Sequence, residues 1–199
     1  MTKKEMIWRE ILFQARKNKK VQFTQKELAR KFGFSLSTIF NALKVPRRAS
    51  IVKVSGRFFI LRDYRKLLYL WASNHSIKKD LIYQARVNEV NYLEGKMPPE
   101  VDFGLYSAFK FLYKNIPADY DHLYIYCFPK DLNSILQRLK LDKKSKSKNI
   151  YPNFFVLEKD KWQNIYGKTL LPEQIFVDIW NAPEWYAKDF LKKLEEKLL

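Results

Sequence analysis

The first third of the chain begins with a helix signal followed by apolar positions at helical spacing. Thr2 and Glu5 have the spacing of a capping box, in which each side chain bonds the backbone amide of the other residue. The apolar residues that follow share one helical face: Ile7, Trp8, Ile11, Leu12 and Ala15. We therefore expect a helix that runs to about Lys17, with Trp8 in the core.

A second helix is predicted a few residues later by the same start signal. Thr24 and Glu27 repeat the capping-box spacing ahead of a helix that reaches about Phe32. Gly33 follows, and glycine suits a turn whose backbone needs a positive φ. The chain is therefore expected to turn sharply at Gly33.

A third helix is predicted over residues 36–44. Ser35 is a favourable N-cap, and Pro46 is expected to end the helix because proline lacks a backbone N–H. Two short helices that cross across a tight turn need small or apolar facing residues. The sequence supplies Leu28, Ala29, Phe32, Phe34, Ile39, Ala42 and Leu43. Residues 23–44 therefore read as a helix-turn-helix, with an ordinary helical hairpin as the alternative.

A β-hairpin is predicted immediately after these helices. Residues 51–55 and 58–62 are strand-like runs joined through Ser55-Gly56-Arg57. Three helices followed by a hairpin is the order of a winged helix domain, whose third helix enters the DNA major groove. We assign this domain to residues 1–66.

The rest of the chain, residues 67–199, mixes helical and strand-like patterns. A connector helix is expected at 67–74, and Asn74-His75-Ser76 breaks its pattern. His75 has no acidic or cysteine neighbour in the sequence, so we expect a surface or capping role.

The elements expected beyond this break alternate in type. They are a strand within 83–93, a helix at 105–113, a strand at 123–128, a helix at 132–139, a strand at 154–157, and helices opened by Pro172 and Pro183. The predicted fold class is α+β, with an N-terminal winged helix-turn-helix domain followed by a mixed α/β domain.

Charge separates the two parts of the chain. The 199 residues contain 38 Lys and Arg against 21 Asp and Glu, a net charge of +17. Residues 1–66 hold 18 of the basic and 4 of the acidic residues, so they carry +14 of this charge. Basic composition alone is weak evidence, because lysine-rich surfaces also occur without a partner. Its concentration around a helix-turn-helix points to a nucleic-acid partner.

The outward face of the third helix supplies the expected base contacts. These are Ser35, Ser37, Thr38 and Asn41. Asn can bond adenine in bidentate fashion, and Ser or Thr can bond base edges. Phe40 stays open between a core position, which we favour, and an exposed contact to a thymine methyl group.

Polar and basic residues around this face are expected to contact phosphates, which position a protein without reading sequence. The predicted phosphate contacts are Gln25, Lys26, Lys44, Arg47, Arg48, Lys53 and Arg57. A lysine-rich segment at 142–149 is expected to be a solvated loop, although it could add phosphate contacts.

Other site chemistry finds little support. Cys127 is the single cysteine and lies in an apolar run, so we expect a buried, unreactive thiol. The residue spacings indicate no metal site and no cofactor. No run of about 18 uncharged apolar residues and no secretory signal is apparent, so we expect a cytoplasmic protein with no membrane partner.

One pattern would fit an enzyme. Asp119 and Asp121 precede the strand at 123–128 and could hold divalent ions for nucleotidyl transfer. Gly104 and Ser107 loosely match the glycine-serine element of nucleotidyltransferases, and Glu158 could be a third carboxylate. We favour a simple turn at residues 119–121, and hence no enzymatic activity.

The layout resembles the AbiEi-type antitoxins of abortive-infection systems and their related transcriptional regulators. The runs that carry the resemblance, after the winged helix, are Phe103-Gly104-Leu105-Tyr106-Ser107-Ala108, Tyr124-Ile125-Tyr126, Asn153-Phe154-Phe155-Val156-Leu157 and Gln174-Ile175-Phe176-Val177-Asp178-Ile179-Trp180. The resemblance covers most of the chain and brings no catalytic residues. It implies a DNA-binding autorepressor whose operon partner is a nucleotidyltransferase-type toxin, neutralised through the C-terminal domain largely without a stable complex.

The leading hypothesis is a sequence-specific regulator that binds double-stranded DNA, of the antitoxin-like autorepressor kind. The first alternative is a divalent-metal-dependent nucleotidyltransferase that uses Asp119 and Asp121. The second is an RNA-associated protein, since basic winged helices also bind structured RNA.

Overall fold

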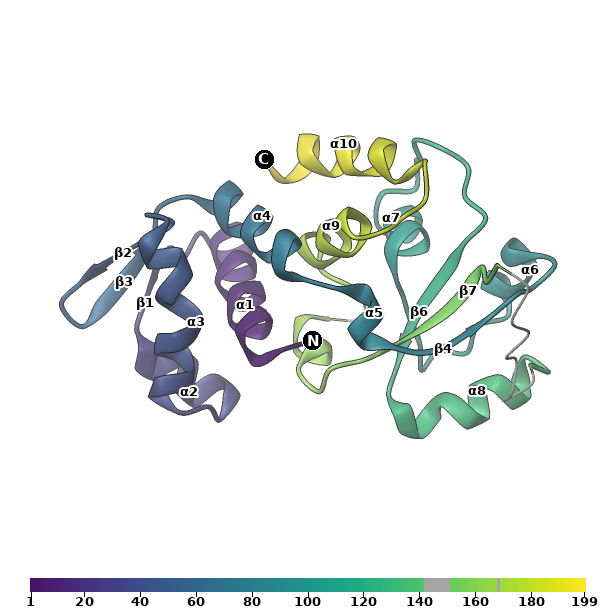
Figure 1. The fold of residues 1–199 in the computed structure, drawn as a ribbon, viewed down its shortest axis with the longest axis horizontal. Helices are drawn as coiled ribbons and strands as arrows, with labels where there is room; N and C mark the ends of the chain where they lie inside the picture. The colour runs from purple at the N-terminus through teal and green to yellow at the C-terminus, as the bar shows by residue number, and fades with distance from the viewer. Residues whose placement is uncertain (142–150, 168) are drawn as a thin grey trace. The chain divides into compact units, whose positions relative to one another are not determined.

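The computed structural model describes residues 1–141, 151–167 and 169–199, and its fold is α+β (Figure 1). The chain divides into two compact units, residues 1–75 and residues 76–198. The division falls at the predicted break Asn74-His75-Ser76 and not after residue 66. The connector helix, α4, packs on α1 and therefore belongs to the first unit.

The first unit, which the structure describes throughout, combines four helices with a small antiparallel sheet. Its elements are α1 (Lys3–Asn18), β1 (Gln22–Phe23), α2 (Gln25–Phe32), α3 (Leu36–Arg48), β2 (Val52–Ser55), β3 (Phe58–Leu61) and α4 (Tyr64–Asn74). The strand order is β1-β3-β2. Figure 1 shows the hairpin of β2 and β3 projecting from the helices of this unit.

The predicted helix starts in this unit are confirmed. Thr2 and Glu5 form both bonds of a capping box at the start of α1. The Thr24 hydroxyl accepts from the amide of Glu27 at 3.1 Å. The second predicted box is only half formed, because the Glu27 carboxylate pairs with Lys20 Nζ at 2.9 Å and not with the amide of Thr24. Gly33 has a φ of 64°, the left-handed conformation that the turn was expected to need.

The expectation that Pro46 ends the third helix is wrong, because α3 continues through Pro46 to Arg48. A residue at position 46 would normally donate its amide proton to the carbonyl of Ala42, and proline has no such proton. The indole Nε1–H of Trp8 donates to that carbonyl instead, at 2.9 Å. A side chain from α1 thus replaces the missing bond, and the helix extends.

The core of the first unit forms where α1 packs against α3 and α4. Trp8 is fully buried there, as predicted, together with Ile39 and Leu43 of α3. Phe23 and Phe59 stack across the sheet with ring centroids 5.6 Å apart. Burial of each such side chain contributes about 1.5–3 kcal/mol of hydrophobic stabilisation.

The prediction for His75, a surface or capping role, is confirmed only in part. His75 is the C-cap of α4, which fits a capping role, but it is buried rather than at the surface. Its Nδ1 lies 2.7 Å from Glu5 Oε1. Burial alone would raise the pKa of Glu5, but hydrogen bonds from His75 and Thr2 lower that pKa to about 2. The acidic partner of His75 is therefore Glu5, which is 70 residues earlier in the sequence, in the first turn of α1.

The second unit is built on a four-stranded sheet with the order β4-β7-β6-β5. Its described elements are α5 (Ile77–Asp80), β4 (Leu81–Ala85), α6 (Val90–Gly95), β5 (Asp102–Phe103), α7 (Leu105–Tyr113), β6 (Leu123–Cys127), η1 (Pro129–Asp131), α8 (Leu132–Arg138), β7 (Phe154–Glu158), η2 (Gln163–Tyr166), α9 (Pro172–Trp180) and α10 (Ala187–Leu198). Strands β6 and β7 are parallel, and the other pairs are antiparallel.

The two faces of β6 are used differently. Leu123, Ile125 and Cys127 belong to an apolar cluster that also takes in Ile135 of α8, so the predicted burial of Cys127 is confirmed. The alternate residues, Tyr124 and Tyr126, are also buried. α7 packs on β6 and on α9.

The final helix begins at Ala187 and not at Pro183. Between them, the carboxylate of Glu184 accepts hydrogen bonds from the hydroxyls of Tyr106 and Tyr124, which tie this stretch to α7 and β6. The lysine-rich segment at 142–149 lies outside the described residues.

Candidate nucleic-acid interface

Helix α3 presents a polar face to solvent and an apolar face to the core. Ile39, Ala42 and Leu43 are buried, so the helical period turns Ser37 and Asn41 outward, and both are exposed. Thr38 lies between the two faces and is half-buried. Because the core buries the apolar face of α3, its polar face points outward, as predicted.

Ser35 has a local structural task besides any contact to a base. Its hydroxyl accepts from the Thr38 amide at 3.2 Å, which caps α3. It also lies 2.9 Å from the hydroxyls of both Ser37 and Thr38. The three hydroxyl groups therefore form one cluster at the N-terminus of α3, close to where a groove-bound helix makes its base contacts.

The basic residues predicted to contact phosphates lie at the surface of the first unit. Those of α3 and the β2–β3 hairpin are all exposed: Lys44, Arg47, Arg48, Lys53 and Arg57. Gln25 and Lys26 occupy the first turn of α2, where Gln25 is half-buried and Lys26 is exposed. Arg47 and Arg48 lie in the last turn of α3, which the helix dipole favours for cations.

The acidic residues of the first unit are all engaged away from α3 and the hairpin. The unit holds four carboxylates, those of Glu5, Glu10, Glu27 and Asp63. Glu5 pairs with His75, and Glu10 and Glu27 pair with Lys31 and Lys20 at 2.7 and 2.9 Å. Asp63 pairs with Lys66 at 3.5 Å. No carboxylate of this unit is paired with a cation of α3 or the hairpin.

A hollow of about 450 Å³ lies beside these cations. It is lined by Arg47, Ser50, Val52, Lys53, Val54 and Arg62, so three cations and no carboxylate surround it. An open cationic hollow of this kind suits a phosphate group.

Sequence reasoning missed Arg62, which was taken as the end of a strand. The hairpin register contains the signal that would have found it. Lys53 lies opposite Ile60, so these two side chains share one face of the hairpin. Arg62 comes two residues after Ile60, and side chains two residues apart on a strand point to the same face, so Arg62 lies on the face of Lys53.

Phe40 is exposed, contrary to the core position that we favoured. Its exposed fraction is 42%. Lys44 Nζ lies 5.6 Å and Arg47 Cζ 5.5 Å from its ring centroid. The ring therefore lies on the outer surface of α3 among cations.

The residues of the enzyme alternative do not come together. Asp121 is exposed and accepts from Tyr186 at 3.0 Å, and its Oδ1 lies 2.7 Å from His122 Nδ1. In the parallel register, Glu158 is beside Cys127, at the opposite end of β6 from Asp121. Within the described residues no group of three His, Cys, Asp or Glu side chains is arranged to hold a metal ion.

Gly104 has a packing role in the second unit. It precedes α7, and its amide donates to the carbonyl of Tyr124 at 2.8 Å. A Cβ at this position would lie 3.3 Å from atoms of Tyr124 and Tyr126. The glycine lets the start of α7 approach β6 closely, which explains its presence without a phosphate ligand.

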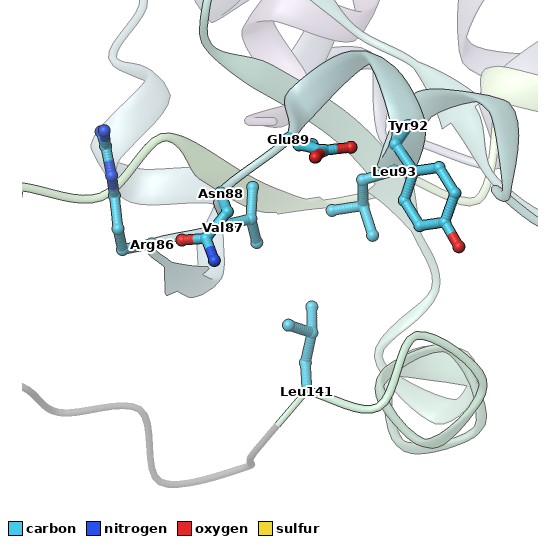
Figure 2. A pocket seen from close by; sticks show the side chains of 7 residues that line it. All are labelled: Arg86, Val87, Asn88, Glu89, Tyr92, Leu93 and Leu141. Atoms are coloured by element: carbon cyan, nitrogen blue, oxygen red, sulfur yellow. The ribbon is translucent and has the colours of Figure 1, made fainter.

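A second hollow, of about 540 Å³, lies in the second unit and contains none of the predicted site residues. It is lined by Arg86, Val87, Asn88, Glu89, Tyr92, Leu93 and Leu141. Figure 2 shows the Leu141 side chain pointing toward Val87 and Leu93. Residue 142, next to Leu141, is outside the described residues.

Comparison with protein-family models finds no match for this chain, and searches of curated proteins and of solved structures find none either. The resemblance to AbiEi-type antitoxins therefore stays a prediction from the residues. Among the helices that the structure describes, none has the length and apolar character needed to cross a membrane.

Proposed function

We propose that the chain is a sequence-specific regulator that binds double-stranded DNA through a winged helix formed by its first unit. The observation that carries the proposal is the distribution of charge in that unit. Its four carboxylates pair with residues outside α3 and the hairpin, which leaves a surface of exposed cations around the polar face of α3. A positively charged surface beside a helix that can fit the DNA major groove is suited to bind a polyanion.

In this proposal α3 enters the major groove and the hairpin lies along the backbone. Ser37, Thr38 and Asn41 face base edges, with Asn41 able to bond adenine in bidentate fashion. Arg48, Arg57 and the cationic hollow at Arg47, Lys53 and Arg62 contact phosphates, which fix the register of the protein on the duplex. The order of three helices and a hairpin supports this docking mode.

The regulatory role is proposed from the resemblance to AbiEi-type antitoxins. The second unit would then act on a nucleotidyltransferase-type toxin, and the first unit would repress the shared operon. A neighbouring gene that encodes such a toxin, with growth arrest relieved by co-expression of this chain, would support the role. Absence of a toxin gene would leave a DNA-binding regulator of another kind.

The salt dependence of binding to duplex DNA tests the proposed interface. The variant Arg47→Gln/Arg48→Gln removes two exposed cations from α3. If both contact phosphates, the slope of log K against log salt should fall in magnitude by about 1.8. The matched control, Lys17→Gln/Lys19→Gln, removes two exposed cations of the same unit from the end of α1. An equal change in both variants would contradict the assigned interface.

Two further measurements separate the alternatives. Competition between duplex DNA and duplex RNA is expected to favour DNA, and stronger binding to RNA would overturn the choice of nucleic acid. A labelled-nucleotide transfer assay with magnesium is expected to show no transfer. Transfer by the parent chain that is lost in Asp121→Asn would establish the nucleotidyltransferase instead.

A further inference from the structure

Phe40 is exposed on a helix whose core positions are filled by other residues. Ile39, Ala42 and Leu43 supply the buried face of α3. The ring of Phe40 remains 42% exposed, and Leu36, one helical turn earlier, is 55% exposed. A large apolar side chain that the core does not require is available for contact with a partner.

Two cations lie over this exposed ring. Lys44 and Arg47 follow Phe40 by four and seven residues, so all three share one stripe of α3. Both charged groups lie within about 6 Å of the ring centroid, which is the range of a cation–π contact. Contacts of this kind hold the ring on the outer surface and place it beside groups that attract an anion.

The chemistry of the stripe is therefore mixed, with an apolar spot next to two positive charges. A DNA major groove offers the same combination, since phosphates flank it and the C5-methyl group of thymine is its exposed apolar feature. We propose that Phe40 is a specificity-determining residue that contacts a thymine methyl group when α3 lies in the major groove. This inference rests on the proposed DNA-binding function and adds a base preference that hydrogen-bonding side chains do not provide.

Replacement of thymine by uracil tests the contact, because it removes the methyl group and keeps the hydrogen-bonding edge. The full chain first enriches a duplex from a randomised DNA library. The enriched duplex is then synthesised in two forms, with thymine or with uracil throughout. Burial of one methyl group predicts that the parent binds the thymine form about fourfold more tightly for each contacted thymine. In Phe40→Ala the two forms should bind about equally.

Two control variants make the result specific. Phe111→Ala removes a ring that is 53% exposed and has Lys110 Nζ 6.0 Å from its centroid, but that belongs to the second unit. It is expected to keep the full preference for thymine. Phe40→Leu keeps an apolar side chain and should retain most of the preference. Unchanged thermal unfolding of Phe40→Ala shows that the loss is not one of folding.

The outcomes distinguish failure of the role of Phe40 from failure of the proposed DNA binding. A parent that binds both duplex forms equally, or a Phe40→Ala variant that keeps the preference, overturns the role of Phe40 and leaves the proposed DNA binding intact. If no duplex is enriched and the parent binds neither form, the proposed function fails together with the inference.

Discussion

The indole N–H of Trp8 donates to the carbonyl of Ala42 at 2.9 Å, and this carbonyl is the one that Pro46 leaves without a helical donor. The bond joins α1 to α3 and lets α3 continue to Arg48, so two predicted phosphate contacts, Arg47 and Arg48, are in the last turn of a helix. Packing in the core thus positions part of the candidate interface.

Loss of the indole donor should destabilise the first unit. Trp8→Phe leaves the buried carbonyl of Ala42 unpaired, which costs about 1–3 kcal/mol of unfolding free energy, in addition to the smaller ring. Denaturant unfolding followed by circular dichroism measures the loss. Trp185→Phe is the control, since Trp185 is 76% exposed and should change little.

A double-mutant cycle tests the pairing of these positions. Pro46→Ala restores a backbone N–H that can bond Ala42, so the loss caused by Trp8→Phe should be smaller in the Pro46→Ala background. Additive effects of the two substitutions would show that the indole bond does not substitute for the helical one.

The pair Glu5–His75 predicts a specific dependence of stability on pH. The pKa of Glu5 is lowered from 4.5 to about 2 on folding, so its ionised form favours the folded state. The stability contributed is present above pH 4.5 and is lost as the pH falls toward 2. At neutral pH it amounts to roughly 3 kcal/mol by linkage.

Substitution of Glu5 isolates this contribution. The difference in unfolding free energy between the parent and Glu5→Gln should be at full size above pH 4.5 and shrink as the pH falls toward 2. Glu27 is at the same position of α2, but its side chain is 38% exposed and its partner is the exposed Lys20, so Glu27→Gln is expected to have a much smaller effect over the same pH range. A Glu5→Gln difference that does not vary with pH would argue against the linkage.

Base readout by Asn41 is tested by comparing specific with random duplexes. Asn41→Ala should cost about 1–3 kcal/mol of binding free energy on a preferred duplex and much less on random DNA. Fluorescence anisotropy with both duplexes at one salt concentration measures the two losses. Equal losses would place Asn41 among the positioning contacts.

Gly104 should be intolerant of a side chain. Gly104→Ala places a Cβ 3.3 Å from the Cβ and carbonyl oxygen of Tyr124, and rigid neighbours of this kind imply a destabilisation of about 1–3 kcal/mol. Gly95→Ala is the matched control, because nothing lies within 4 Å of its added Cβ. The melting temperatures of the two variants test the prediction, and that of Gly104→Ala is expected to be lower. Similar melting temperatures would refute the packing role of Gly104.

Local signals predicted much of the first unit. The caps at Thr2, Thr24 and Ser35, the positive φ of Gly33 and the hairpin turn around Gly56 depend on residues a few positions away, and the structure contains each of them. The outward face of α3 followed from the same short-range periodicity.

Two of the misplaced residues depend on distant partners. Pro46 sits inside a helix because Trp8 arrives from α1, and His75 is buried because Glu5 meets it from the opposite end of the unit. Phe40 was assigned to the core by its apolarity, although other residues already fill that face. The outcomes at Pro46 and His75 cannot be deduced from a window of neighbouring residues, whereas the outward position of Phe40 follows from the residues around it in α3.

The pairing of Glu5, Glu10, Glu27 and Asp63 with residues outside α3 and the hairpin also bears on kinetics. No carboxylate of the first unit has to leave a cation of α3 or the hairpin before an anion approaches. Long-range attraction can then steer a polyanion onto an uncovered surface. The association rate constant should therefore be high, with little delay from rearrangement of the protein. It should fall steeply as salt is added.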